Sequence, residues 1–367
     1  MSGATRAERP VADFSGLRTS AAGFLETAPS TIQELARTVS IAARQSAPLR
    51  TRAQGHSLNG STLPAPDELL LRTRELREVR FAAPGTVSAG AGTVLWTLQG
   101  VLRAHGFDLP VLNDGYPGPT VGGYLAAGGF GPNSGVHGGF WHNVLAVRLV
   151  DGRGRVREVG AADPLFPWLF GSMGQLGVFA EATLAIVPFE GTAPYPAGKS
   201  LRAPALDAPP HLPLAFAPKG DERLFWFTLF VPDEELADAR RELAALEARH
   251  ARALRFAERY TYPVRHRGLV APLVYPQPRP FTATGAWGWL GDASRASVER
   301  LLEFDRDFMA LAHSRPDWRR YIQSELPAGP EVYRQCFGAE RYDALRKLKS
   351  ELDPAALLNR GSVFPPP

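Results

Sequence analysis

Residues 112–143 read LNDGYPGPTVGGYLAAGGFGPNSGVHGGFWHN, and this stretch decides how the chain folds. It is dense in glycine and shows no clear helical or strand period. Glycine is favoured where the backbone must take a positive φ or approach another group closely. The stretch therefore predicts a chain that folds closely around a flat or phosphorylated ligand. Within it, the paired glycines of Pro119–Gly129 expose successive N–H groups that can hold a diphosphate, although a strained glycine-rich turn has the same pattern.

The common nucleotide-binding fingerprints are absent. Gly90–Gly92 lacks the third glycine of the Rossmann pattern, and the pattern that begins at Gly129 ends on Ser134. The P-loop pattern does not occur either. A dinucleotide site in this chain is therefore expected to be of a non-Rossmann type.

A second glycine turn, GHSLNG at Gly55–Gly60, exposes His56 to whatever the turn wraps. A loop histidine that bonds its own backbone is the plainer interpretation. The turn is not the GxSxG elbow of a hydrolase, because Asn59 stands where the last glycine is needed. Farther along, GSMGQLGVFAEATL at 171–184 places a glycine-rich turn before a strand whose backbone could pair with an adenine edge.

Composition excludes several classes of protein. The 367 residues predict two or three domains, and 44% hydrophobic with 21% charged residues are ordinary globular values. We expect no membrane span, no secretory signal and a cytoplasmic location. The net charge of +4 is spread along the chain, which argues against nucleic-acid binding. The single cysteine, Cys336, excludes an intramolecular disulfide, and His137 and His142 lack a nearby acidic partner, so no metal site is expected.

Periodicity predicts a β/α alternation in short pieces up to residue 190 and a second, smaller α+β unit after it. Helices are expected over 31–46, 94–105, 165–171, 233–254, 295–312 and 341–352. Strands are expected over 48–52, 69–72, 86–93, 144–150, 155–160, 177–188, 223–231 and 282–290. The proline- and alanine-rich residues 190–218 predict a linker or irregular segment.

Two further features invite a chemical interpretation. Asp114 is an acidic group in an apolar, glycine-rich segment, where burial would raise its pKa and suit it to general-base catalysis; an Asp–Gly turn is the alternative. Bulky aromatic residues in the middle section could form a pocket for an aromatic ligand, but strand residues of this kind more often belong to the core. These residues are Phe225, Trp226, Phe227, Trp287 and Trp289.

Taken in order, the motifs resemble the FAD-linked oxidases of the para-cresol methylhydroxylase/vanillyl-alcohol oxidase superfamily, and most closely cytokinin dehydrogenases and their bacterial relatives. The segments that carry the resemblance are RTRAQGHSLNG, TVSAGAGTVLWTLQGVL, DGYPGPTVGG, HNVLAVRLVDGRG, LFGSMGQLGVFAEATLAIVP and LDPAALLNRGSVF. The resemblance implies an α+β fold, with a two-subdomain FAD-binding domain of PCMH type and a smaller α+β substrate (cap) domain with an antiparallel sheet. It implies FAD-binding residues 1–190, substrate-binding residues 191–315, and a C-terminal segment 316–367 that returns to the FAD domain.

In that family, the histidine of the GHS turn is bonded to the flavin 8α-methyl group, which gives His56 this role by resemblance. The turn implied to wrap the diphosphate runs over Ala53, Gln54, Gly55 and Ser57. Further residues implied to bind FAD are Asn59, Thr120, Gly122, Gly123, Val178 and Ser362. Some relatives add a cysteine link just before the VGG segment; Pro119 and Thr120 stand there, so a single attachment is expected.

The resemblance makes Asp114 the base that takes a proton from the substrate, although one extra residue separates it from Thr120, and makes Tyr321 the tyrosine at the flavin. Ser362 replaces a family glutamine and Ala126 a family serine. The implied reaction moves a hydride from a C–H next to nitrogen or oxygen to flavin N5, as in amine oxidation to an imine by cytokinin dehydrogenases. A sugar, alcohol or aldonolactone oxidase, a natural-product tailoring oxidase and a non-catalytic flavin-binding protein are the alternatives. The expected partners are a small-molecule substrate and either O2 or a quinone as electron acceptor.

Overall fold

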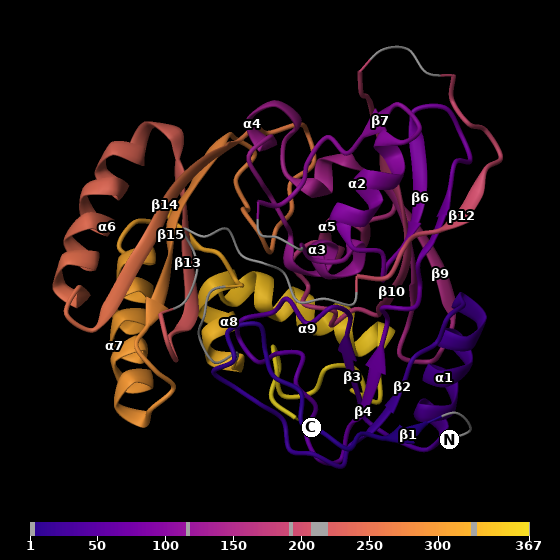
Figure 1. Ribbon diagram of the computed structural model, residues 1–367, viewed down its shortest axis with the longest axis horizontal. Coiled ribbons are helices and arrows are strands. Elements are labelled where there is room, and N and C mark those ends of the chain that lie inside the picture. The colour runs from indigo at the N-terminus through magenta and orange to yellow at the C-terminus, as the bar shows by residue number, and fades with distance from the viewer. Residues whose placement is uncertain (1–3, 115–117, 191–193, 207–218, 324–328, 367) are drawn as a thin grey trace.

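The computed structural model describes residues 4–114, 118–190, 194–206, 219–323 and 329–366. Helices and mostly antiparallel sheets make it an α+β fold, as predicted. One sheet with two covering helices lies on the left of Figure 1, and the sheets of the N-terminal half lie on the right. The helices of the C-terminal segment lie between them in this view.

The first sheet is small and has the strand order β1-β2-β4-β3. Its strands are β1 (Thr5–Arg6), β2 (Leu25–Thr27), β4 (Leu69–Arg72) and β3 (Leu49–Arg52). Helix α1 (Ile32–Arg44) connects β2 to β3, and both of these strands run parallel to β4. Thr31 caps α1 by accepting a hydrogen bond from the Glu34 backbone at 3.1 Å, so the predicted helix start is confirmed.

The second sheet has six antiparallel strands in the order β12-β5-β6-β10-β8-β9. Their bounds are β12 Ser200–Arg202, β5 Glu78–Arg80, β6 Thr86–Gly90, β10 Val178–Ala185, β8 Val144–Val150 and β9 Val156–Gly160. Strands β8 and β9 lie in the ranges expected from the sequence and pair as an antiparallel hairpin. Strand β12 comes from the stretch expected to be a linker, whose residues 191–193 and 207–218 lie outside the described part. Beside the sheet lie α2 (Leu95–Arg103) and the pair β7 (Phe107–Asp108) and β11 (Val187–Pro188).

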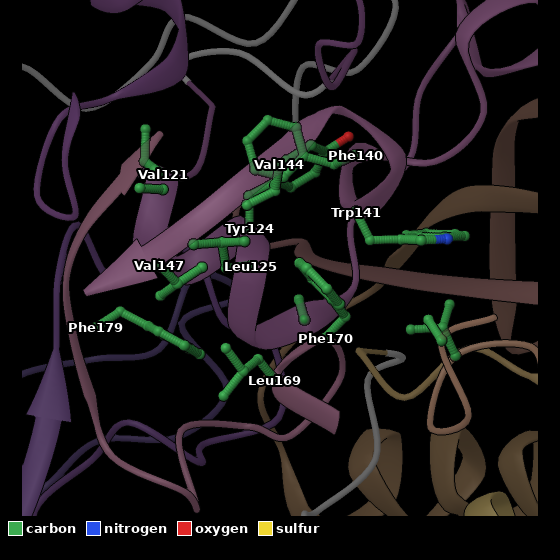
Figure 2. Close-up of a cluster of buried hydrophobic side chains, with 14 of the residues drawn as sticks. Val121, Tyr124, Leu125, Phe140, Trp141, Val144, Val147, Leu169, Phe170 and Phe179 are labelled. Atoms are coloured by element: carbon green, nitrogen blue, oxygen red, sulfur yellow. The ribbon is translucent and has the colours of Figure 1, made fainter. Parts of the chain in front are cut away.

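The glycine-rich stretch contains helices that its sequence pattern did not predict. The main one is α3 (Val121–Ala127), capped by Thr120 and ended by Gly128 at φ +67°. Its buried side chains pack against strand residues of β8 and β10, as Figure 2 shows. The glycines hid the helical spacing, yet Gly122 is needed there, because a Cβ would lie 2.8 Å from that of Ala91. Shorter helical turns in this stretch are α4 (Ser134–His137) and η1 (Phe140–Asn143). Helix α5 (Phe166–Leu169) lies beyond the stretch, within the helix expected over 165–171.

The third large sheet has the antiparallel order β14-β15-β13-β16. Its strands are β14 Leu254–Val264, β15 Phe281–Leu290, β13 Arg223–Pro232 and β16 Arg319–Arg320. Helices α6 (Leu236–His250) and α7 (Arg295–Ala312) cover one face and bury a separate core with it. The helix expected over 233–254 is shorter, because the turn η3 (Asp233–Glu235) precedes α6 and Leu254 already belongs to β14.

The C-terminal segment forms α8 (Pro330–Phe337) and α9 (Ala339–Leu352) and then returns to the first sheet. Leu358 forms a parallel bridge with Leu49, and the backbone of Asn359 donates to Leu49 at 2.8 Å. A buried ion pair between Lys349 and Asp353 at 2.7 Å fixes the end of α9, because Asp353 also accepts from the backbone of the following tail. The last residues of the chain are thereby placed next to the turn that follows β3.

Candidate active site

A large cavity lies between the first sheet, the α3 region and the third sheet. It contains about 1380 Å³ of non-atom space, its open mouth included. Eleven of the thirteen residues implied by the resemblance line it: Ala53, Gln54, Gly55, His56, Ser57, Asp114, Thr120, Gly122, Gly123, Val178 and Tyr321. Segments that are far apart in the sequence therefore converge on one site.

His56 sits in the glycine turn after β3, with its ring stacked on Phe14 at a centroid distance of 4.2 Å. Burial lowers the pKa of His56 to about 4, so the imidazole is neutral at pH 7. Its Nε2 atom is buried and has no hydrogen-bond partner in the described part of the chain. A neutral ring nitrogen without a partner is chemically suited to bond or contact a ligand in the cavity.

The turn around His56 requires glycine at Gly55. Its φ is +80°, and a Cβ there would lie 2.2 Å from a guanidinium nitrogen of Arg52. On the α3 side, the Thr120 hydroxyl accepts from the Gly123 backbone at 3.2 Å, and Gly122 donates its backbone N–H to Ala91 at 2.8 Å. These contacts bring the backbone of both glycine segments to the cavity wall.

Two implied cofactor residues, Asn59 and Ser362, do not line the cavity but lie behind it. Asn59 accepts from the Ser57 hydroxyl at 2.7 Å and donates to the Tyr333 hydroxyl at 3.2 Å, so it supports the glycine turn from the protein side. Ser362 accepts from Gln175 at 3.0 Å and donates to the Asn359 carbonyl at 2.8 Å. Their side-chain groups are bonded within the protein, and a direct contact of either residue with FAD stays a prediction.

Asn359 is a cavity residue that sequence reasoning missed. Its side-chain oxygen accepts from the backbone and hydroxyl of Thr51, both at 2.9 Å, and its amide donates to the Gly174 carbonyl at 2.8 Å. It thereby joins the C-terminal tail to the start of the His56 turn and to the loop before β10. The signal that could have found it is its place in LLNRG, just after the last helix.

The third sheet supplies an aromatic wall. Trp226 of β13 and Trp287 of β15 are register partners whose rings stack at 5.0 Å with an interplanar angle of 13°. Both line the cavity, together with Tyr260. Phe225 and Phe227 point to the opposite face, into the core under α6 and α7. Each interpretation therefore holds for part of the set. Because side chains alternate along a strand, Phe225 and Phe227 belong to the core, whereas Trp226 and Trp287 belong to the cavity wall.

Asp114 lies at this wall and accepts a short hydrogen bond from the Tyr262 hydroxyl of β14. Its side chain is exposed, which corrects the expectation of burial: the carboxylate stands at the mouth of the cavity rather than in its interior. Tyr321 is buried, and its ring meets Trp226 edge-on at 5.4 Å. Burial raises the pKa of Tyr321, so its hydroxyl stays protonated at neutral pH.

Other candidate chemistry falls elsewhere or does not assemble. Cys336 is buried in α8, outside the cavity lining, and burial raises its pKa to about 11. Among the described residues, no group of three or more histidine, cysteine or acidic side chains is arranged to hold a metal ion. A helix with the length and apolar character for crossing a membrane is likewise not found in that part of the chain.

Residues 26–160 match the protein family described as FAD binding domain. This segment includes the His56 turn, Asp114 and α3. Over this segment the chain is similar to proteins named as dehydrogenases, oxidases and FAD-linked oxidoreductases. The cavity is accordingly a candidate FAD site, and the unpartnered Nε2 of His56 and the glycine-lined walls fit that cofactor.

Individual relatives differ in name. The chain is 29% identical over 176 residues to D-lactate dehydrogenase from Archaeoglobus fulgidus, an alignment of 46% of this chain and 40% of the relative. It is 33% identical over 175 residues to cytokinin dehydrogenase 6 from Oryza sativa subsp. japonica, covering 44% and 32%. It is 35% identical over 164 residues to alditol oxidase from a Streptomyces species, covering 44% and 38%. The chain thus spans well under half of each relative, and these names do not agree on one substrate.

Proposed function

We propose that the protein is an FAD-dependent oxidoreductase that oxidises a small amine to an imine, in the manner of cytokinin dehydrogenases. The observation that carries this proposal is the convergence, in one cavity, of the His56 turn, the Asp114 carboxylate and the paired rings of Trp226 and Trp287. When bound, FAD would supply the acceptor for the hydride, and with it the two electrons, that leave the substrate.

The cofactor would be held by the two glycine segments. Ala53–Ser57 would offer backbone N–H groups, and Gly122–Gly123, whose own N–H groups are bonded within the protein, would let the cofactor approach the backbone closely. Val178 would face the adenine end, and His56 would bond the flavin covalently through its neutral ring. Cys336 lies outside the cavity lining, which favours a single attachment. We further propose 1–190 as the FAD domain, 191–315 as the substrate domain and 316–367 as the returning segment, with the β13–β16 pairing extending the substrate sheet to Arg320.

Substrate oxidation removes a hydride from carbon and a proton from the neighbouring nitrogen. Asp114 would accept that proton, and the hydrogen bond that Tyr262 donates to one of its carboxylate oxygens supports this role by orienting the group. Trp226 and Trp287 offer flat surfaces against which a planar substrate can be oriented and water excluded. Tyr321, held protonated by burial, can donate or accept a hydrogen bond at neutral pH but is not available as a phenolate base.

An alcohol, sugar or aldonolactone substrate is the second candidate, favoured by the similarity to alditol oxidase. The same Asp114 could accept the proton of an O–H group. The aromatic wall favours the amine, because a polyol site needs several polar side chains that point at hydroxyl groups. An oxidative step in a natural-product pathway and flavin binding without turnover remain as further alternatives, and O2 or a quinone is the proposed acceptor.

The proposal is tested in two steps. First, the purified protein is denatured in acid: yellow colour that stays with the pellet shows covalent flavin, and its loss in His56→Ala assigns the bond. Second, reduction of the flavin is followed without oxygen against aromatic secondary amines, polyols and 2-hydroxy acids. Reduction by amines alone supports the proposal, reduction by polyols alone favours the alternative, and a colourless protein that takes up no FAD refutes both.

A further inference from the structure

Arg52 is a charged cavity residue to which the proposed mechanism gives no role. Its guanidinium donates to the Ala12 carbonyl at 2.7 Å and to the Thr62 hydroxyl at 3.0 Å, two neutral acceptors. Within the described residues no carboxylate lies within ion-pair distance of it. Burial, together with nearby Arg72, lowers the pKa of Arg52 to about 10, so the protein around it disfavours the charge.

The neighbouring strand provides a direct comparison. Arg72 of β4 is the register partner of Arg52 of β3, and it forms an ion pair with Glu26 at 2.6 Å. Arg72 does not line the cavity. The acid whose charge most favours the charged form of Arg52 is Asp13, and Asp13 is already paired with Arg18 at 3.2 Å. Of these two adjacent arginines, Arg52 faces the cavity and has no acidic partner in the described part of the chain.

The position of the guanidinium indicates which ligand would complete it. The Arg52 guanidinium packs against Gly55: a Cβ added at Gly55 would lie 2.2, 2.5 and 2.9 Å from three guanidinium atoms. The guanidinium therefore lies directly at the Ala53–Ser57 turn. An arginine side chain has five N–H donors in a planar fork, and the two bonds inside the protein use two of them. The remaining donors and the unbalanced charge suit a phosphate, which binds a planar fork well.

We propose that Arg52 is the counter-ion of the diphosphate of FAD, adding a charge to the backbone contacts of the Ala53–Ser57 turn. This inference depends on the proposed function, because it assumes that FAD occupies the cavity. It concerns cofactor affinity and predicts that the phosphate-bearing part of the flavin, rather than its ring, is what Arg52 recognises. It also gives Gly55 a second purpose, since any side chain there would displace the guanidinium.

The test measures reversible flavin binding in a His56→Ala background, so that no covalent bond hides the affinity. Dissociation constants for FAD and for riboflavin, which has the ring but no phosphate, are compared between this background and its Arg52→Gln, Arg52→Lys and Arg72→Gln derivatives. Circular dichroism confirms that each variant folds. The dissociation constant for FAD is also followed from low to high salt.

We expect Arg52→Gln to weaken FAD binding roughly ten- to hundred-fold and to leave riboflavin binding within about twofold. It should also flatten the salt dependence of FAD binding, because a screened charge has been removed. Arg52→Lys should recover part of the affinity, and Arg72→Gln should change it little. Equal losses for FAD and riboflavin with an unchanged salt dependence would show that Arg52 only supports the turn, and an unchanged FAD affinity would also overturn the proposal. If the His56→Ala parent and the unmodified protein both bind no FAD, the proposed function itself fails; if they bind it and Arg52→Gln binds it equally well, only the role of Arg52 fails.

Discussion

Replacing Asn359 by alanine should remove the connection between the C-terminal tail and the cofactor side of the cavity. The substitution deletes three hydrogen bonds, two accepted from Thr51 at 2.9 Å and one donated to Gly174 at 2.8 Å. Asn359 is only 3% exposed, so water cannot readily replace all of them. Unpaired buried groups cost about 1–3 kcal/mol each, and partial access of water to Thr51 lowers the sum.

The backbone adds a second contribution. Asn359 has a φ of +51°, a conformation that asparagine tolerates better than alanine by about 1 kcal/mol. We therefore expect Asn359→Ala to lower the free energy of unfolding by about 4–6 kcal/mol. Asn359→Gly, which loses the same hydrogen bonds without the strain, should be about 1 kcal/mol less destabilised and serves as the matched control.

The assay is denaturant unfolding of the flavin-free protein, followed by tryptophan fluorescence, with FAD affinity measured in parallel. FAD binding should weaken in both variants, because Thr51 begins the turn that carries His56 and Gly174 belongs to the loop before β10. A loss of less than about 1 kcal/mol in Asn359→Ala would refute the reasoning, since it would mean that the three hydrogen bonds add nothing beyond what water supplies.

Three further outcomes follow from the site. Asp114→Asn should slow flavin reduction by the substrate about 10²–10⁴-fold while the flavin stays bound, and Tyr262→Phe should slow reduction less. Stopped-flow absorbance measures both rates. A near-normal rate in Asp114→Asn would show that Asp114 is not the base. The flavin-free protein should lose up to about 3 kcal/mol of stability as the pH falls from 6.5 to about 4, because the unfolded chain protonates His56 at its usual pKa of 6.5 while the buried ring resists until about 4. The free energy of unfolding of His56→Ala, measured by denaturant unfolding at several pH values, should change less over this range. An equal pH dependence in the two proteins would contradict the assignment. Gly122→Val should abolish FAD binding, because even a Cβ at this position would lie 2.8 Å from Ala91; tight FAD binding by a folded Gly122→Val protein would show that α3 can shift.

Most elements with strong periodicity were predictable from the sequence. The bounds of β4, β8 and α7 match the expected ranges, because β4 and β8 are short runs of mainly apolar residues and the buried residues of α7 recur at helical spacing. Helix α3 was not predictable, since glycine carries no hydrophobic signal and hides the spacing of Val121, Tyr124 and Leu125. Strand β14 was missed because charged and polar residues occupy many of its partly exposed positions.

The sequence by itself indicated a flat or phosphorylated ligand, and its resemblance to FAD-linked oxidases gave the cofactor class. Glycine turns at His56 and at Thr120–Gly123, in this order and spacing, are local features, and a short-range backbone requirement can be written in a few adjacent residues. The identity of the residues at the cavity wall was decided by the tertiary structure. It placed Asn359 at the cavity and Asn59 behind it, and it turned Trp226 and Trp287 to the ligand side and Phe225 and Phe227 to the core. It also left Arg52 without an acidic partner among the residues that the structure describes. These outcomes depend on which of several chemically similar groups meet across distant segments, and a linear pattern does not encode that geometry.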